Sequence, residues 1–252
     1  MNWTLLTTTT VLALGSIGCT PSEQLVRLQT GLLLSDGQQA LAYPSFLEDP
    51  QTAETYRQAG LEARQQEDFE TAIATLKTAV ALAPKAVSGY VILGWTQHLV
   101  GQHDAAIATL QQALVHDSQH VPALNALGIA YLVNGDLEAA IATHTQAKTL
   151  QTDNEIAYYN LSLAYQRLPN LAAAVDHATR ATELEPYNPH PWVALALAHW
   201  SQQDNEKAQA AYQQALSLDS RYYNAFHLDH LLQAGFSSEQ IQLVEAIRVS
   251  VR

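Results

Sequence analysis

Apolar positions recur along this chain with two spacings at once. From residue 53 onward, short stretches carry apolar residues at i, i+3, i+4 and i+7, which predicts amphipathic helices. These stretches come in pairs, and the pair repeats every 34 residues. In the third pair we expect helices over residues 121–134 and 137–150, separated by Gly135 and Asp136. Glycine tolerates a positive φ, and aspartate caps the helix that follows it.

Small residues mark the same repeat. One recurs at Gly60, Gly94, Gly128, Ser162 and Ala196. Twelve residues after each marker lies an alanine, and nineteen after it lies another: Ala72, Ala106, Ala140, Ala174, Ala208 and Ala79, Ala113, Ala147, Ala181, Ala215. Paired helices approach closely only where side chains are small. The spacing therefore predicts helical hairpins whose two helices touch at these positions.

A large residue stands four positions before each marker, at Tyr56, Tyr90, Leu124, Tyr158 and Trp192. The combined pattern resembles the tetratricopeptide repeat, and residues 154–168 resemble its cyanobacterial members. The resemblance covers five units, at 53–86, 87–120, 121–154, 155–188 and 189–222. It implies an all-α fold, a right-handed α-solenoid of five hairpins. We expect residues 223–252 to form C-terminal capping helices, the first over 223–234 and the second from Ser237.

The N-terminal residues do not follow the repeat pattern. Residues 2–18 carry no charged side chain and end in Ser16-Ile17-Gly18, followed by Cys19. This resembles a bacterial lipoprotein signal, in which the cysteine is lipidated; Ser16 and the missing basic residues depart from that pattern. An uncleaved anchor over 1–19, an ordinary secretory peptide and no signal at all remain alternatives. We interpret 20–52 as a tether with a short amphipathic helix near 22–34, with Pro44 and Pro50 marking loops.

An anchored N-terminus predicts a membrane-associated protein. If the chain is exported, we expect it to face the periplasm or the thylakoid lumen, and otherwise the cytoplasmic face of a membrane. No other apolar run is long enough to span a bilayer.

The resemblance also implies where a partner would bind. In this family the first helix of each hairpin lines an inner groove, and the matching positions here are unusually apolar. We expect a protein or peptide client to bind there, with Asn125 and Asn160 bonding to its backbone and tryptophans as anchors. The predicted groove consists of Val91, Trp95, Leu99, Asn125, Ile129, Leu132, Val133, Ile156, Tyr159, Asn160, Leu163, Arg167, Val193, Leu197 and Trp200, with His98 and His190 beside them. Chaperone-binding relatives clamp a carboxylate with Lys, Arg and Asn; the matching positions here hold Leu61, Ile92, Pro122 and Ala126, so we expect no such clamp.

The net charge and the absence of catalytic motifs argue against several classes of function. The formal net charge is −12, from 24 acidic and 12 basic residues, which argues against nucleic-acid binding. No phosphate-binding loop, H-E-x-x-H or G-x-S-x-G motif is present, so we expect no enzyme and no cofactor. We predict an interaction scaffold, used in assembling or maturing a membrane complex, with photosynthetic complexes among the candidates.

Two alternatives compete with that prediction. The first is a structural or oligomerising module whose groove is filled by its own chain. The second is a metal-binding or enzyme-accessory subunit, for which His116 with His120, and His227 with His230, have usable helical spacing. Because three or four converging ligands are not evident, we predict no metal site.

Overall fold

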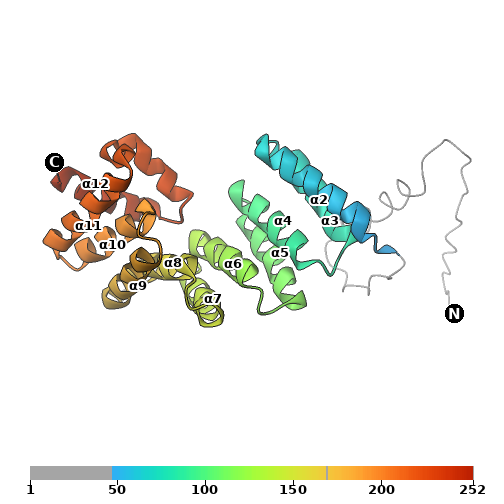
Figure 1. The fold of residues 1–252 in the computed structure, drawn as a ribbon, viewed down its shortest axis with the longest axis horizontal. Helices are drawn as coiled ribbons and strands as arrows, with labels where there is room; N and C mark the ends of the chain where they lie inside the picture. The colour runs from blue at the N-terminus through green and yellow to red at the C-terminus, as the bar shows by residue number, and fades with distance from the viewer. Residues whose placement is uncertain (1–46, 169, 252) are drawn as a thin grey trace, which may run out of the picture.

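A computed structural model describes residues 47–168 and 170–251. The lipoprotein-like signal with Cys19, the tether up to residue 46 and the helix expected near 22–34 lie outside the described residues. The described part is helical throughout, which confirms the predicted all-α class. The hairpins follow one another from α2 and α3 at one end to the C-terminal elements at the other (Figure 1).

Each predicted 34-residue unit contains one helical hairpin. The five hairpins are α2 (Pro50–Gln65) with α3 (Phe69–Leu82), α4 (Val87–Leu99) with α5 (His103–His116), α6 (Val121–Asn134) with α7 (Leu137–Leu150), α8 (Glu155–Arg167) with α9 (Leu171–Leu184), and α10 (Pro189–Ser201) with α11 (Asn205–Leu218). The first helices of successive units also contact one another, α4 with α6, α6 with α8 and α8 with α10. These contacts build a solenoid in which one row of helices faces inward.

Short polar residues begin most of these helices. Asp49, Asp68, Asn154, Asn170 and Asp204 each accept a hydrogen bond from the backbone N–H three residues further on. Such a bond satisfies one of the free N–H groups of the first turn.

One predicted boundary was wrong. Pro50 starts α2 instead of a loop, because proline fits the first turn of a helix, where no N–H partner is needed.

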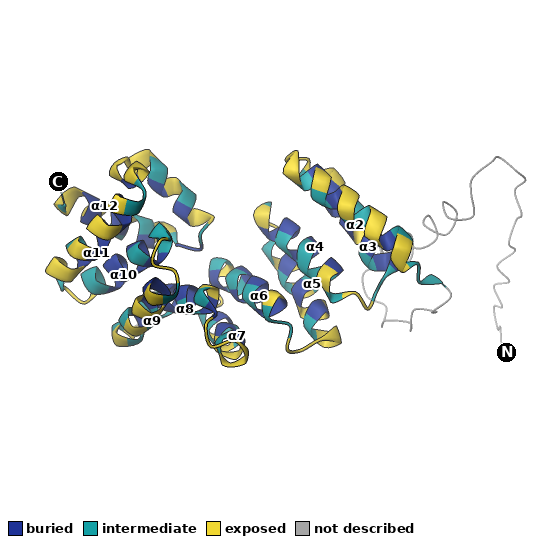
Figure 2. Cartoon of the chain, viewed as in Figure 1, coloured by how far each residue is buried: buried dark blue, intermediate teal, exposed yellow. Residues whose placement is uncertain are grey.

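The small marker residues lie where the two helices of a hairpin touch. A Cβ atom added at Gly60 would lie 2.6 Å from Cγ of Leu76, and one at Gly94 would lie 2.6 Å from Cγ of Leu110. At Gly128 the added atom would meet the ring of His144. The ten recurrent alanines are buried, each no more than 4% exposed. Figure 2 shows buried residues along the helix faces that meet other helices.

In four of the five hairpins the turn between the two helices holds a left-handed residue. Gly101 and Gly135 adopt φ of 75° and 93°, and the equivalent residues Glu67 and Gln203 are held at 61° and 66°. A residue with a Cβ atom is strained in this region, whereas glycine is not.

Replacing Gln203 with glycine is therefore expected to raise the free energy of unfolding by about 0.5 kcal/mol, since relief of strain outweighs the extra freedom of the unfolded chain. Urea unfolding measures the change. Gln202→Gly is the matched control: its φ is −81°, so it should lower stability instead. A loss of stability in both variants would contradict the strain argument.

The C-terminal segment differs in part from the prediction. Residues 223–234 were expected to form one α-helix, but the structure has two 3-10 helices, η2 (Ser220–Tyr223) and η3 (Ala225–Leu232). Asn224 separates them because its backbone is extended and its side chain caps Phe226. Gly235 ends the segment at φ 90°. Helix α12 (Ser238–Ser250) begins after Ser237, which forms a capping box with Gln240.

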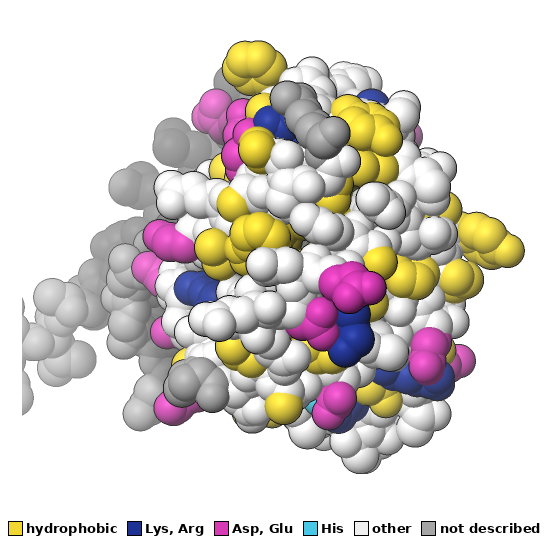
Figure 3. All heavy atoms as spheres, turned by 90° about the vertical axis from the view of Figure 1, so that its left-hand side faces the viewer, with side chains coloured by type: hydrophobic (Ala, Val, Ile, Leu, Met, Phe, Trp, Pro, Cys, Tyr) yellow, Lys and Arg dark blue, Asp and Glu magenta, His cyan; other side chains and the backbone are white. Residues whose placement is uncertain are grey.

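Figure 3 looks onto the end of the solenoid that carries these C-terminal elements. Apolar side chains form separate groups there, among polar atoms and adjacent acidic and basic side chains. Arg221 pairs with Asp219, and Arg248 with Glu245, in this region. Exposed apolar groups scattered in this way are ordinary on a protein surface. The inner face of the solenoid is the better candidate for a site.

Candidate functional site

The C-terminal segment folds back onto the inner face of the solenoid. The Tyr159 hydroxyl of α8 donates to the carbonyl of Ala234 at 2.7 Å, and its ring lies 6.2 Å from that of Phe236. From α12, Gln240 Nε2 donates to the carbonyl of Leu163 at 3.0 Å and to Gln166 Oε1 at 2.8 Å. These contacts join residues more than 70 positions apart, so the end of the chain forms part of the inner face.

Half of the predicted groove is consequently closed. Leu132, Tyr159, Asn160, Leu163, Val193 and Leu197 are buried, none more than 7% exposed. Most of them share one core cluster with Leu228, Leu231 and Phe236 of the C-terminal segment. Our expectation of an open groove along its whole length is therefore wrong for this half, because the chain's own apolar side chains cover it. The self-filled alternative describes this part of the molecule.

The other half remains open to solvent. Leu99 and Ile156 are 45% and 42% exposed. Half-buried positions complete this part: Val91, Trp95, Asn125, Ile129 and Val133. The Trp95 ring stacks on His98, with ring centroids 5.0 Å apart, and His98 is buried. This contact orients the indole at the edge of the open half.

Three predicted polar or aromatic site residues have other partners. Asn125 and Asn154 join α6 to the start of α8 through two amide hydrogen bonds, of 3.2 and 2.9 Å. Asn160 Nδ2 donates to the carbonyl of Ile156 in its own helix. The two predicted backbone-binding amides therefore bond within the chain. Trp200 packs against the core cluster that includes the C-terminal segment.

Arg167 also serves the fold. Its Nη1 donates to the carbonyl of Leu132 at 2.7 Å, close to the C-terminal end of α6. A positive charge is favourable there because the last carbonyls of a helix carry partial negative charge. Partial burial lowers the pKa of Arg167, but the guanidinium stays charged.

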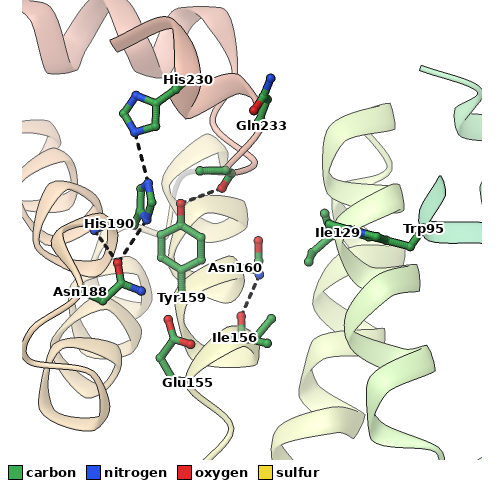
Figure 4. A pocket seen from close by; sticks show the side chains of 11 residues that line it. Trp95, Ile129, Glu155, Ile156, Tyr159, Asn160, Asn188, His190, His230 and Gln233 are labelled. Atoms are coloured by element: carbon green, nitrogen blue, oxygen red, sulfur yellow. Dashed lines mark hydrogen bonds between the residues drawn. The ribbon is translucent and has the colours of Figure 1, made fainter. Parts of the chain in front are cut away.

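A cavity of about 400 Å³ lies where the open half meets the C-terminal segment. We call it the groove-end cavity (Figure 4). Trp95 and Ile129 line one side, and His230, Gln233 and Ala234 belong to the C-terminal segment. The rest of the lining comes from α8, α10 and the residue before α10: Glu155, Ile156, Tyr159, Asn160, Asn188 and His190. Sequence reasoning missed Glu155, Asn188, Gln233 and Ala234 as site residues.

Glu155 is the one carboxylate among the described residues that line this cavity, and its environment is unusual. Burial, together with repulsion from Glu185, raises the pKa of Glu155 to about 7. None of the ion pairs formed within residues 47–168 and 170–251 includes Glu155. No lysine or arginine is among the described residues that line the cavity. At the end of an apolar groove, Glu155 is therefore a carboxylate that has no cationic partner within the described part of the chain.

Two histidines, His190 and His230, line the cavity where α10 meets the C-terminal segment. Nε2 of His190 lies 3.2 Å from Nε2 of His230, which is 3.1 Å from the Tyr222 hydroxyl. The rings of His227 and His230 stack with centroids 4.0 Å apart. Burial, then repulsion from His230, lowers the pKa of His190 to about 4, so it is neutral at pH 7. These rings form the polar part of the contact between α10 and the C-terminal segment, whose apolar part is the shared core cluster.

The metal alternative rested on two histidine pairs. His120 Nδ1 accepts from the N–H of Ala123 and caps α6, whereas the His116 ring lies against Tyr90. Among the residues that the structure describes, no three His, Cys, Asp or Glu side chains are arranged to hold a metal ion. Within residues 47–168 and 170–251, no helix has the length and apolar character needed to cross a bilayer.

Comparisons with known proteins agree with this architecture. Sequence models described as tetratricopeptide repeat match residues 57–119, 98–164, 156–188 and 189–222. A comparison with curated proteins gave no significant match.

Several solved structures share the fold. A structure described as MamA protein is 25% identical, with a TM-score of 0.59, over 68% of this chain and 93% of that one. A MamA fragment from Desulfovibrio magneticus RS-1 is 18% identical, with a TM-score of 0.61, over 68% and 96%. TTC0263, a tetratricopeptide protein of Thermus thermophilus, is 18% identical, with a TM-score of 0.58, over 73% and 98%.

Proposed function

Because the chain belongs to the tetratricopeptide repeat family, we propose that it is a non-catalytic scaffold that binds a client protein through the open half of its inner face. The observation that supports this most directly is the apolar surface of the exposed Leu99 and Ile156 and the half-buried Trp95, which ends in the groove-end cavity. Solenoids use such inner surfaces for binding, and exposed apolar patches commonly mark contact sites.

The binding surface is shorter than the sequence indicates. The C-terminal segment covers α8 and α10, so a client contacts α4, α6 and the start of α8. Trp95 is the natural anchor, since it is large, half-buried and oriented by His98.

The setting of this binding is a further part of the proposal. Residues 1–19 and Cys19 favour a tether to a membrane, where the scaffold would hold a client during assembly of a complex. This part is supported by the sequence of the N-terminus alone.

Affinity capture from membrane extracts tests the proposal. The purified full chain is compared with Trp95→Ala, and Tyr187→Ala serves as control because Tyr187 is 86% exposed and does not line the cavity. We expect Trp95→Ala to reduce the captured client about tenfold, since truncating an aromatic anchor typically costs more than 1 kcal/mol, while Tyr187→Ala captures it as the wild type does. Equal capture by all three proteins would reject the groove as the binding surface.

A further inference from the structure

The open half of the inner face is a groove with one closed end. A chain lying along α4 and α6 would run toward Trp95 and Ile129 and then meet the C-terminal segment at His230, Gln233 and Ala234. Tyr159 fixes this wall through its hydrogen bond to Ala234. A client side chain that reaches the end of the groove therefore enters the groove-end cavity.

The chemistry of that closed end is acidic on an apolar background. Glu155 lies below the Tyr159 ring in Figure 4, and Trp95, Ile129 and Ile156 supply the apolar lining. The other groups at the cavity are amides and the imidazoles of His190 and His230. A carboxylate taken partly out of water without a cation is costly, and a cation that enters the cavity would relieve this cost.

The aromatic lining favours the same kind of ligand. Lysine and arginine combine an apolar stem with a charged head, so their stems can lie along Ile156 while the head reaches the carboxylate. Aromatic faces such as those of Trp95 and Tyr159 also attract cations. The overall charge of −12 draws basic segments toward this surface.

We propose that the groove-end cavity binds a lysine or arginine side chain of the client, with Glu155 as its counter-ion and Trp95 and Ile156 contacting the neighbouring apolar residue. This inference rests on the proposed function, because it names the kind of client segment that the groove takes. An anionic side chain is disfavoured by Glu155 and by the nearby Glu185. A neutral one leaves the carboxylate without a partner.

The raised pKa of Glu155 sets the conditions of the test. Its carboxyl is largely ionised only above pH 7. Tyr159 and Glu185 interact with it electrostatically, and the titratable side chains of His190 and His230 line the same cavity. Burial raises the pKa of Tyr159 well above its usual value and lowers that of His190 to about 4, so both are neutral at pH 8. Binding is therefore measured at pH 8.

The probe is a set of nonapeptides, acetylated at the N-terminus and amidated at the C-terminus. The central residue is lysine, arginine, norleucine or glutamate, and the other positions are mixtures of Leu, Phe, Ser and Gly. Binding of the purified full chain is measured at moderate salt. We expect the lysine and arginine sets to bind about tenfold more tightly than the norleucine set, and the glutamate set to bind most weakly.

Two variants distinguish a specific ion pair with Glu155 from general attraction of a basic peptide to the acidic chain. Glu155→Gln is expected to reduce the preference for lysine over norleucine to less than about twofold. Glu185→Gln removes the same amount of charge outside the cavity lining and should keep most of the preference. A preference that survives equally in both variants would overturn the proposal, because it would reflect only the net charge of the chain. Absence of binding by the wild type to every set would also overturn it.

The same peptides distinguish this inference from the proposed function. If Trp95→Ala weakens binding of all sets while Glu155→Gln leaves the lysine preference intact, the groove binds the peptide but Glu155 is not its counter-ion. If Trp95→Ala changes nothing, the groove itself is not the binding surface.

Discussion

Replacing Gly94 with valine is expected to lower the free energy of unfolding by about 3 kcal/mol. A Cβ atom at this position would lie 2.6 Å from Cγ and 3.0 Å from Cδ2 of Leu110, and 3.3 Å from the carbonyl oxygen of Ala106. Leu110 is fully buried and Cγ is not the free end of its side chain. Helices α4 and α5 must therefore move apart, which opens the contact on which the hairpin depends. Urea unfolding followed by circular dichroism measures the loss.

A compensating change at Leu110 provides the control. The pair Gly94→Val with Leu110→Ala keeps the number of side-chain carbon atoms between the two helices constant. We expect the double variant to lose less free energy of unfolding than the two single variants lose together, by at least about 1 kcal/mol, because the effects of residues in contact are not independent. Simple additivity would show that the close approach at Gly94 is not what limits the size of this residue.

Replacing His144 with leucine is expected to raise the free energy of unfolding by about 2 kcal/mol at pH 7.5. His144 is fully buried, and neither ring nitrogen has a hydrogen-bond partner of normal geometry among the residues that the structure describes. It lies against Gly128, where the first and second units place Leu76 and Leu110 against their own glycines. A leucine should fill this space without burying unsatisfied polar atoms.

The same substitution should change how stability depends on pH. Burial lowers the pKa of His144 to about 3, and the backbone of Gly128 offsets only part of this effect. The unfolded chain binds a proton at this residue below about pH 6.5, and the folded chain does not. Stability therefore falls as the pH drops from 6.5 toward 3, by about 2 kcal/mol at pH 5 from this residue alone.

Urea unfolding at pH 7.5 and pH 5.0 separates the two contributions. The other titrating groups are shared by wild type and His144→Leu, so the advantage of the variant should grow from about 2 to about 4 kcal/mol at the lower pH. His116→Leu, at an exposed position, is the control and should show no such growth. An equal advantage at both pH values would mean that His144 is protonated in the folded protein.

The solenoid could be predicted from sequence because its contacts are local and periodic. Gly60, Gly94 and the recurrent alanines mark close helix contacts that involve residues 12 to 19 positions apart, and each unit repeats the same geometry. A pattern seen five times is difficult to misread. The two 3-10 helices were not predicted, since most of their residues follow the last repeat unit, which ends at residue 222, and Asn224 interrupts them only through its own cap.

The closed end of the groove could not be predicted in the same way. The hydrogen bonds from Tyr159 to Ala234 and from Gln240 to Leu163 span 75 and 77 residues. A tyrosine or a glutamine in a sequence does not indicate which distant carbonyl it will bind. Self-filling was one of the alternatives at the sequence level, but only the structure assigns it to α8 and α10. The sequence did not indicate Glu155 as a site residue, because an acidic residue in the first turn of a helix is ordinary.

The path of the C-terminal segment restricts how such an array can change by duplication. In a solenoid held together by contacts between neighbours alone, a unit can be gained or lost anywhere without disturbing distant ones. Here Ala234, Gly235 and Gln240 lie against α8, which belongs to the hairpin before the last one. A unit inserted after α9 would carry these residues away from their partners. Lengthening is compatible with this arrangement at the other end, ahead of α2, where it would leave the closed end of the groove intact.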